Sequence, residues 1–341
     1  MAPLRHVRME RWLRIGKAEA VRVAILAGID EAGFGPLLGP LVVSSAAFSV
    51  EPALLGEDLW QVFGKSVGKC RKHLAGRLLI ADSKKAYNRA EGLGHLERTS
   101  LAALECLGNR PTELVELLTR LCPDCLRRLA GYPWHQDLQQ CRLAPASSDA
   151  RIASKVFVED LQAHGGSLVD LRTCCLDVAY FNRMVQNVRN KAQVLFIAVT
   201  QLIQALLSKF PGEEIHIQVD RQGGRTHYRE NLLRSFPDME LTVVQEGEEC
   251  SIYEMCDGPR KVKLAFEIEA DDRYLPVSLA SMVSKYIREL LMDCMNLYFA
   301  KMDAGLKPTA GYWQDGQRFV QELRTRLPHL VVDTDRLIRC R

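Results

Sequence analysis

Short apolar runs that end in charged or turn-forming residues recur along the chain, and each run has the length of a buried strand. Residues 21–29 and 41–50 form the first two runs. Gly39-Pro40, just before the second, predicts a tight turn and therefore an antiparallel hairpin. Further strands are predicted at residues 78–81, 168–176, 215–219 and 262–268.

Apolar residues at helical spacing fill the intervals, and they predict helices at residues 93–129, 180–207 and 277–302. Strands joined by helices after an opening hairpin are typical of an α/β fold, a mixed sheet flanked by helices. The best candidate for a helical insertion is the segment 110–166. The predicted organisation begins with a basic N-terminal arm (residues 1–22) and the first part of the domain (23–109). The insertion (110–166) follows, then the remainder of the domain with C-terminal helices (167–330) and a tail (331–341).

Two adjacent carboxylates, Asp30 and Glu31, stand at the end of the first predicted strand, just ahead of a glycine-rich turn. Paired acids are costly to bury unless a cation or a cationic partner neutralises them. Asp220 ends another predicted strand in the same way. On its own the pair describes a charged loop more often than a metal site, so the downstream acids decide between the two interpretations.

The amino-acid composition indicates a globular protein. The 341 residues are 47% hydrophobic and 26% charged, which is ordinary for a globular protein, and the net charge of +3 says little about partners. Six Lys or Arg residues lie within the first 22, a modest indication of an arm near an anion. Polar residues interrupt the most apolar helix candidate, 194–207, so we expect no stretch with the length of a membrane span.

Eleven cysteines, an odd number without a secretory signal, indicate reduced thiols and a cytoplasmic protein. Cys122 and Cys125 have the spacing of half a zinc site, but no second pair with matching spacing follows. Cys141, Cys174 and Cys175 complete such a site only if the fold brings them there. Structural thiols are the ordinary interpretation, with a zinc site or a redox pair as the alternatives.

Common nucleotide-binding and hydrolase motifs are incomplete in this chain. Gly64-Lys65-Ser66 resembles the end of a phosphate-binding loop, but that loop needs glycine where Leu59 stands. The glycines at 33, 35 and 39 miss the dinucleotide spacing by one residue, and no Gly-x-Ser-x-Gly elbow occurs.

A set of motifs in order resembles ribonuclease HII, the type 2 ribonucleases H. These motifs are Asp30-Glu31-Ala32-Gly33, Gly35-Pro36, Gly39-Pro40, Asp82-Ser83-Lys84-Lys85, Asp220, residues 280–289 and Gly311-Tyr312. They extend from about residue 25 to 313, and the segment 110–166 has no clear counterpart. The resemblance implies a ribonuclease H-like mixed sheet. It also implies a metal-dependent endoribonuclease that cuts RNA in RNA/DNA hybrids or at ribonucleotides embedded in DNA.

By position, the residues that match the family's acids are Asp30, Glu31, Asp220 and Glu289. The resemblance implies that they hold Mg²⁺ or Mn²⁺ in a two-metal site, and hard oxygen ligands suit both cations. Glu289 stands where the family usually has aspartate, so it is either a ligand or the partner of Lys285 on a helix face. Asp293, one helical turn later, is either an added ligand or a solvated residue.

The residues that match the family's substrate-binding positions are Gly33, Phe34, Gly35, Ser83, Lys84, Lys85 and Tyr312. The family usually has Gly-Arg-Gly, and Phe34 cannot form the charge-assisted bond of that arginine. Phe34 either stacks on a base or sugar or packs within its loop. Tyr312 is either a core residue or a stacking residue. Asp271 and Asp272, just before the last long helix, either cap it or lie near the metals, and capping is favoured.

The expected partner is nucleic acid, with no membrane, and we expect a monomer. Two alternatives stay open beside the nuclease interpretation. One is a nucleic-acid-binding paralogue that has lost turnover, motivated by Glu289 and Phe34. The other is a nuclease of the same fold with a different nucleic-acid substrate.

Overall fold

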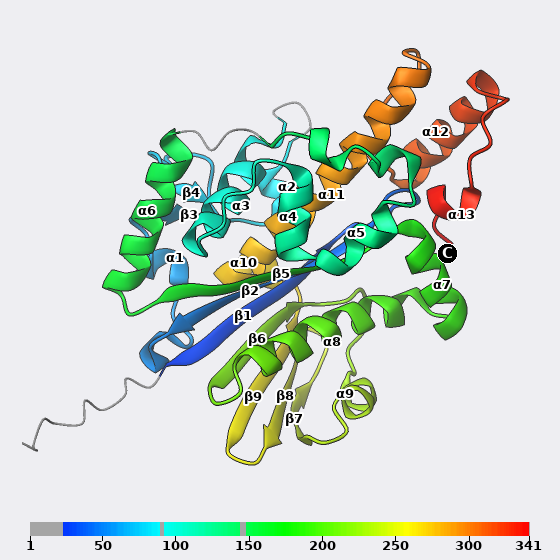
Figure 1. The fold of residues 1–341 in the computed structure, drawn as a ribbon. Helices are drawn as coiled ribbons and strands as arrows, with labels where there is room; N and C mark the ends of the chain where they lie inside the picture. Colours follow the sequence, from blue (N-terminus) through cyan, green and yellow to red (C-terminus); the bar gives the residue numbers. More distant parts are fainter. Residues whose placement is uncertain (1–22, 89–91, 144–147, 341) are drawn as a thin grey trace, which may run out of the picture.

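A seven-stranded mixed sheet organises the computed structural model, which describes residues 23–88, 92–143 and 148–340 (Figure 1). The predicted basic arm, 1–22, lies outside the described residues. The order across the sheet is β5 (Ser167–Leu176), β2 (Leu41–Val50), β1 (Ala24–Ala32), β6 (Glu214–Asp220), β9 (Arg260–Glu267), β8 (Cys250–Asp257) and β7 (Glu240–Glu246). A small second sheet pairs β3 (Val67–Gly68) with β4 (Leu78–Leu79).

Strand directions divide the main sheet into three parts. β5, β2 and β1 form an antiparallel meander, which includes the predicted hairpin. β6 and β9 then follow β1 in parallel, and β8 and β7 return antiparallel at the far edge. A three-stranded meander extended by parallel strands on the β1 side is the arrangement of ribonuclease H-like sheets, and it confirms the predicted fold class.

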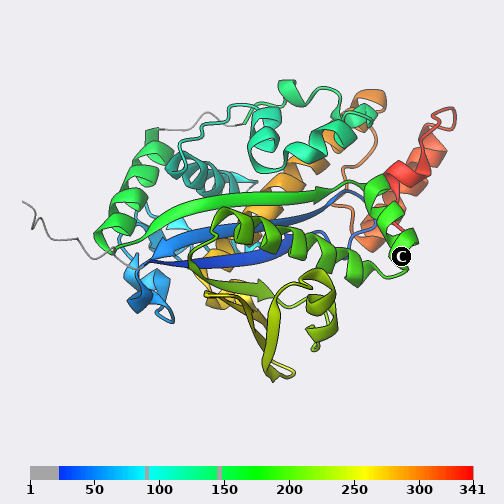
Figure 2. The ribbon, with the colours of Figure 1, turned by 60° about the horizontal axis from the view of Figure 1, so that its bottom comes forward.

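Helices cover both faces of the sheet (Figures 1 and 2). The α-helices are α1 (Leu59–Val62), α2 (Ser83–Ala86), α3 (Gly94–Cys106), α4 (Leu114–Leu121), α5 (Pro123–Leu129), α6 (Ser148–Ala163), α7 (Val178–Val188), α8 (Lys191–Lys209), α9 (Arg229–Ser235), α10 (Ala270–Arg273), α11 (Leu275–Met302), α12 (Trp313–Arg326) and α13 (Thr334–Leu337). Single 3₁₀ turns occur at Pro52–Leu54, Pro133–His135 and Leu138–Gln140. The long helix α11 crosses one face of the central strands, and α8 lies on the other.

Alternation along β1 assigns its side chains to these two faces. Ile25, Ala27 and Ile29 pack with α8, whereas Leu26 packs with the α11 side. Both faces are buried, which explains why the sequence shows continuous apolar runs here instead of an alternating pattern. The segment 110–166 provides α4, α5 and α6, which pack on the α11 side of β2 and β5. Its status as an insertion stays a prediction.

The helix α8 is long and apolar enough to cross a membrane by length and composition, with a mean hydropathy of 1.4. The expectation that no segment reaches that length is therefore wrong. More than half of the helix window is buried inside the molecule, where residues such as Phe196, Leu202 and Ile203 pack on the sheet. A core helix of this kind passes the same test as a membrane span.

Two predicted helices are divided in the structure. The first, 93–129, becomes α3, α4 and α5, because Gly108 takes a positive φ of 76° after α3 and Pro123 begins a new helix. The second, 180–207, becomes α7 and α8, because Arg189 has a left-handed φ of 52° and the Asn190 side chain caps α8. No glycine or proline marks this second break in the sequence.

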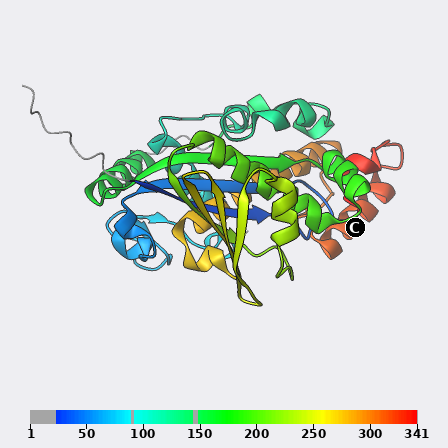
Figure 3. The ribbon, with the colours of Figure 1, turned by 90° about the horizontal axis from the view of Figure 1, so that it is seen from below.

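β7 and β8, at the lower edge of the sheet in Figure 3, were not predicted from the sequence. Most residues of β7 are exposed, including Val243 and Val244, so this strand lacks the apolar run that marks the central strands. Asp257-Gly258, with a positive φ of 58° at the glycine, was the available signal for the turn between β8 and β9.

Candidate active site

The register of two parallel strands brings Asp30 and Asp220 together. β1 pairs with β6 through Ile29 and Val219, so the next residue of each strand is an aspartate at the same edge of the sheet. Ile29 and Val219 both pack on the α8 side, and alternation therefore directs both aspartates toward α11. Glu31 follows Asp30 directly and remains half-buried.

Asp271 is the fourth acid of this cluster. It lies on α10, which follows β9, and the neighbouring Ala270 N donates a hydrogen bond of 2.9 Å to Asp220 Oδ1. Asp271 is buried and close enough to Asp30, Glu31 and Asp220 for their charges to repel one another. The prediction that Asp271 caps α11 is wrong, because that helix begins after Tyr274 without a side-chain cap.

Burial raises the pKa values of all four acids, and repulsion between them adds to the shifts of Asp30, Glu31 and Asp271. Burial is the largest cause for each of them, and it raises the pKa of Glu31 to about 8 and that of Asp271 to about 7. The pKa of Asp30 is raised well above its ordinary value by burial and then by the charge of Glu31. Burial likewise raises the pKa of Asp220, although the hydrogen bond from Ala270 N opposes the shift. The cluster therefore favours a bound proton or a bound cation.

The predicted Ser83, Lys84 and Lys85 lie on α2 beside these acids. The side chain of Asp82 accepts a bond of 2.9 Å from Lys84 N and so begins the helix. The Lys84 ammonium is near enough to the cluster to lower the pKa of Glu31. Lys85 is held elsewhere, because its ammonium pairs with Asp272 at 2.7 Å.

Two serines of α11 form hydrogen bonds to the segments around the acids. Ser284 Oγ donates to the backbone oxygen of Asp30 at 3.0 Å, and Ser281 Oγ donates to Ser83 Oγ at 3.0 Å. Ser281 is also close enough to the Asp30 carboxyl to oppose the rise of its pKa. The buried hydroxyls therefore link β1, α2 and α11 at the acids, a contact that the sequence analysis did not single out.

The donor set fits a hard divalent cation. Four carboxylates converge on one edge of the sheet, and oxygen ligands of this kind are those that Mg²⁺ and Mn²⁺ prefer. Within residues 23–88, 92–143 and 148–340, no three Asp, Glu, His or Cys side chains stand at the spacing of an assembled metal site. The four acids are therefore a candidate donor set and not an assembled metal site.

The structure does not bring Glu289 to this cluster, and its predicted place among the four acids is corrected. Its carboxylate accepts bonds from Lys285 Nζ at 2.7 Å, Arg288 Nη1 at 3.2 Å and Tyr87 Oη at 3.1 Å. Glu289 lies eight residues beyond Ser281 on a straight helix, which is about 12 Å along its axis. Glu289 is thus the anion that compensates Arg288, which is only 1% exposed. Asp293, further along, is exposed.

The glycine loop after Glu31 packs on that buried arginine. Gly33 has a φ of 91°, and a Cβ there would overlap the Arg288 side chain and lie 2.7 Å from Pro40 O. Arg288 Nη2 donates to Leu38 O at 3.3 Å and to Ala310 O at 3.0 Å. Arg288 therefore joins the predicted loop 33–35 to the predicted Gly311-Tyr312.

Tyr312 is not a core residue. It is 52% exposed, and the Arg288 guanidinium lies 5.8 Å from the centre of its ring. Gly311, with a φ of 82°, accepts hydrogen bonds from Leu37 N and Leu38 N at 2.7 and 3.1 Å. The exposed ring consequently stands beside the glycine loop, where a flat group could stack on it.

Phe34 is half-buried and packs against the apolar core on the α8 side. Packing is thus the better of the two interpretations given for this residue. The ammonium of Lys191, at the start of α8, lies 5.2 Å from the centre of the Phe34 ring. Gly35 is exposed, with open space where a Cβ would stand.

The raised pKa of Glu31 predicts a stability that depends on pH and on divalent cations. Because its folded pKa of about 8 exceeds the ordinary 4.5, the folded protein binds more protons than the unfolded chain between these values. Stability should therefore be full at low pH, and the melting temperature should fall by several degrees as the pH rises through that window. A divalent cation at a hundred times its Kd should restore about 2.7 kcal/mol at pH 8.

Thermal melts between pH 5 and 8.5, with and without Mn²⁺, check this expectation. Glu31→Gln should flatten the pH profile and reduce the shift caused by Mn²⁺. An identical melting temperature with and without the cation at pH 8 would contradict it.

Comparisons with known proteins identify no family for this chain. No protein-family model and no curated protein matches the sequence. Among solved structures, the chain is similar to the PCNA:RNase HII complex from Archaeoglobus fulgidus, with 16% identity, a TM-score of 0.43, and 93% of this chain and 94% of that chain covered. It is also similar to Bst-RNase HIII in complex with Mn²⁺, with 11% identity, a TM-score of 0.38, and coverage of 94% and 67%.

A third similar structure is the ribonuclease H2 from Pyrococcus horikoshii OT3, with 14% identity, a TM-score of 0.36 and 92% of each chain covered. At these values the strand order within the chain itself is the stronger guide. An antiparallel meander, β5-β2-β1, continues into the parallel strands β6 and β9. By the order and directions of these strands, the chain has a ribonuclease H-like fold, as its sequence predicts.

Proposed function

We propose that this protein is a metal-dependent nuclease that hydrolyses phosphodiester bonds of RNA in RNA/DNA hybrids or at ribonucleotides embedded in DNA. The observation that carries the proposal is the convergence of four acids, Asp30, Glu31, Asp220 and Asp271, at one sheet edge. Buried carboxylates without a cation cost stability, so the presence of four at one point favours a catalytic use over a structural one.

The four acids would hold Mg²⁺ or Mn²⁺. When bound, such an ion supplies charge stabilisation at the phosphate and makes water a better nucleophile. The Lys84 ammonium interacts with the charges of Asp271, Asp30 and Asp220 and would balance the remaining negative charge. Ser281 and Ser284 hold Asp30 in position. These roles belong to hydrolysis of a phosphodiester, whose barrier is lowered mainly by such electrostatic stabilisation.

Substrate contact is proposed along the glycine loop and Tyr312. Gly35 lets the backbone approach a ribose closely, because it is exposed and has open space where a side chain would stand, while Gly33 allows the turn to pack on Arg288. The exposed Tyr312 ring offers a stacking surface next to this loop. The loop begins two residues after Glu31, and Gly311, next to Tyr312, is hydrogen-bonded to Leu37 and Leu38 just beyond it.

Cleavage of a panel of labelled substrates tests the proposal. Purified protein with Mg²⁺ or Mn²⁺ should cut a DNA duplex with one embedded ribonucleotide or an RNA/DNA hybrid, and should leave an all-DNA duplex intact. Cutting of all-RNA or all-DNA substrates would favour a nuclease of the same fold with another substrate. Salt-sensitive hybrid binding without any cleavage would favour the paralogue that has lost turnover.

Phe34 stands where ribonucleases HII usually have arginine, and this difference leads to a separate prediction about nucleic-acid binding. Lys191 is exposed, lies over the Phe34 ring, and has no carboxylate partner among the described residues. We expect its ammonium to contact a substrate phosphate beside the loop. Lys191→Gln should weaken hybrid binding and reduce the slope of log K against log salt by about one.

Fluorescence anisotropy at several salt concentrations measures this change. In the double variant F34R/K191Q, the added guanidinium should restore both affinity and slope. Lys301→Gln, an exposed lysine near the end of α11, is the matched control and should change neither. Equal slopes for wild type and Lys191→Gln would refute the contact.

A further inference from the structure

The Cys122-Pro-Asp-Cys125 motif folds into a pair of facing thiols. Cys122 Sγ and Cys125 Sγ are 3.0 Å apart at the corner where α4 ends and α5 begins. The sulfur atoms of a disulfide are about 2.05 Å apart, so these two sulfurs need to approach by only about 1 Å to form the bond. Both side chains are buried, with Cys125 only 1% exposed.

Two more thiols lie beside the pair, from the end of β5. Cys175 is buried and donates to the Cys125 sulfur, while Cys174 is half-buried and donates to Gln201 Oε1 at 3.3 Å. The fold therefore gathers cysteines that are separated by about fifty residues in the sequence. None of them contacts the acid cluster in the described part of the chain.

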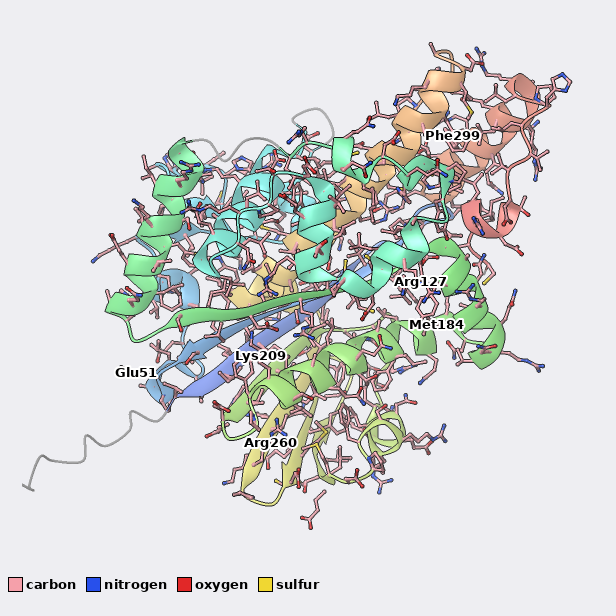
Figure 4. The ribbon with its side chains drawn as sticks, in the orientation of Figure 1. Glu51, Arg127, Met184, Lys209, Arg260 and Phe299 are labelled. Atoms are coloured by element: carbon pink, nitrogen blue, oxygen red, sulfur yellow. The ribbon has the colours of Figure 1, made fainter. Side chains whose placement is uncertain are left out.

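This group lines a cavity of about 590 Å³, outside the proposed active site. All four thiols line it, together with the side chains of Arg120, Arg128 and Arg172. In Figure 4 the labelled Arg127 marks α5 and the labelled Lys209 marks the end of α8, the two helices that flank this region of β5. The cavity therefore offers a small polar reagent a route to these cysteines.

The surroundings distinguish one sulfur of the pair. Hydrogen bonds from Cys122 and then Cys175 lower the pKa of Cys125 to about 5, and the Arg128 guanidinium acts in the same direction. Arg128 is itself held by Asp177 at 2.7 Å and by the backbone oxygen of Cys175 at 2.7 Å. The contacts with Cys175 and Arg128 favour Cys125 as the nucleophilic thiolate and Cys122 as the resolving thiol.

We propose that Cys122 and Cys125 form a reversible dithiol–disulfide site that reacts with hydrogen peroxide through the cavity. The Cys125 thiolate attacks one peroxide oxygen, the O–O bond breaks, and hydroxide leaves to become water. The Cys122 sulfur then attacks the Cys125 sulfenic acid, and a second water leaves as the disulfide forms. In total, two thiols lose two electrons and two protons, and one peroxide becomes two waters.

A metal site is the weaker assignment for these thiols. In the described ranges, no three Cys, His, Asp or Glu side chains are arranged to hold an ion. The short distance between Cys122 and Cys125 suits a bond between the sulfurs better than a shared ligand.

Peptide mapping of the full-length wild-type protein tests the site without any variant. After one equivalent of hydrogen peroxide, the peptide with residues 122 and 125 should lose about 2 Da and its two labelled thiols, and dithiothreitol should restore both. Cys141 and Cys294 serve as an internal control, because their sulfurs are 3.1 Å apart but do not line this cavity. Oxidation of that control pair first would overturn the assignment.

Two single variants test the order of the steps. In Cys122→Ser, a sulfenic acid should accumulate at Cys125 and be trapped by dimedone, whereas Cys125→Ser should leave Cys122 unmodified. Trapping of a sulfenic acid at Cys122 would also overturn the assignment. So would one equivalent of zinc in the purified wild-type protein that protects these thiols from oxidation. Melting curves confirm that each variant is folded.

Discussion

Asp271→Asn is expected to lower the rate of ribonucleotide cleavage by about 100- to 1,000-fold, the size of loss that follows removal of one group that stabilises developing charge in the transition state. Asp271 is buried in the acid cluster, where burial and the charge of Asp220 raise its pKa to about 7. Asparagine keeps the shape of the side chain and removes the charge that would bind a divalent cation.

Asp272→Asn is the matched control for this variant, since it changes the next residue in the same way. Asp272 points away from the cluster, to Lys85 and Lys69, and its side chain is partly exposed. Single-turnover cleavage with saturating Mn²⁺ should give a rate within about threefold of wild type for D272N, as expected for an exposed ion pair. Equal rates for both variants would remove Asp271 from the site.

Gly28→Ala is expected to destabilise the protein by about 3 kcal/mol, at the upper end of overpacking effects. Gly28 lies in the middle of β1 and faces α11, and a Cβ there would overlap the backbone of Pro276 and Val277. These atoms cannot move as a flexible side chain does, so the whole helix must shift away from the strand. The same helix carries Ser281 and Ser284, which hold Asp30.

Denaturant unfolding measures this loss as a lower midpoint at an unchanged slope. Gly212→Ala is the control, because that glycine has open space around it and an ordinary φ. Its midpoint should stay within about 0.5 kcal/mol of wild type. A Gly28→Ala protein of wild-type stability would mean that α11 does not press on β1 as described.

The central strands and most of the acids were predictable because their signals are local. The apolar runs of β1 and β6 are followed at once by Asp30 and Asp220, and a strand end needs no tertiary information to be recognised. The parallel register that sets these two aspartates side by side is a property of the fold, and it follows once β1 and β6 are known to be neighbours.

The fourth acid was misplaced because its position depends on the path of the chain between two elements. Glu289 lies on the predicted helix face but too far along α11, whereas Asp271 reaches the cluster through the short α10. The available signal was an acid soon after the end of β9, the same pattern that marked Asp220. The capping prediction competed with that signal, and Tyr274 in fact precedes the helix.

The break between α7 and α8 was not predictable from turn residues. Arg189 takes the left-handed conformation without glycine, so only the Asn190 cap marked the new helix. This break brings Lys191 over Phe34 and so supplies a cation beside a loop whose own sequence lacks one.

The most direct test is a cleavage assay on a labelled DNA duplex with a single embedded ribonucleotide, run on wild type and Asp30→Asn at increasing Mn²⁺. A catalytic acid cluster predicts cleavage next to the ribonucleotide that rises with Mn²⁺, is absent with chelator, and falls at least 100-fold in D30N. Wild-type cleavage that continues in chelator, or equal rates for wild type and D30N, would contradict the assignment of Asp30, Glu31, Asp220 and Asp271 as the active site.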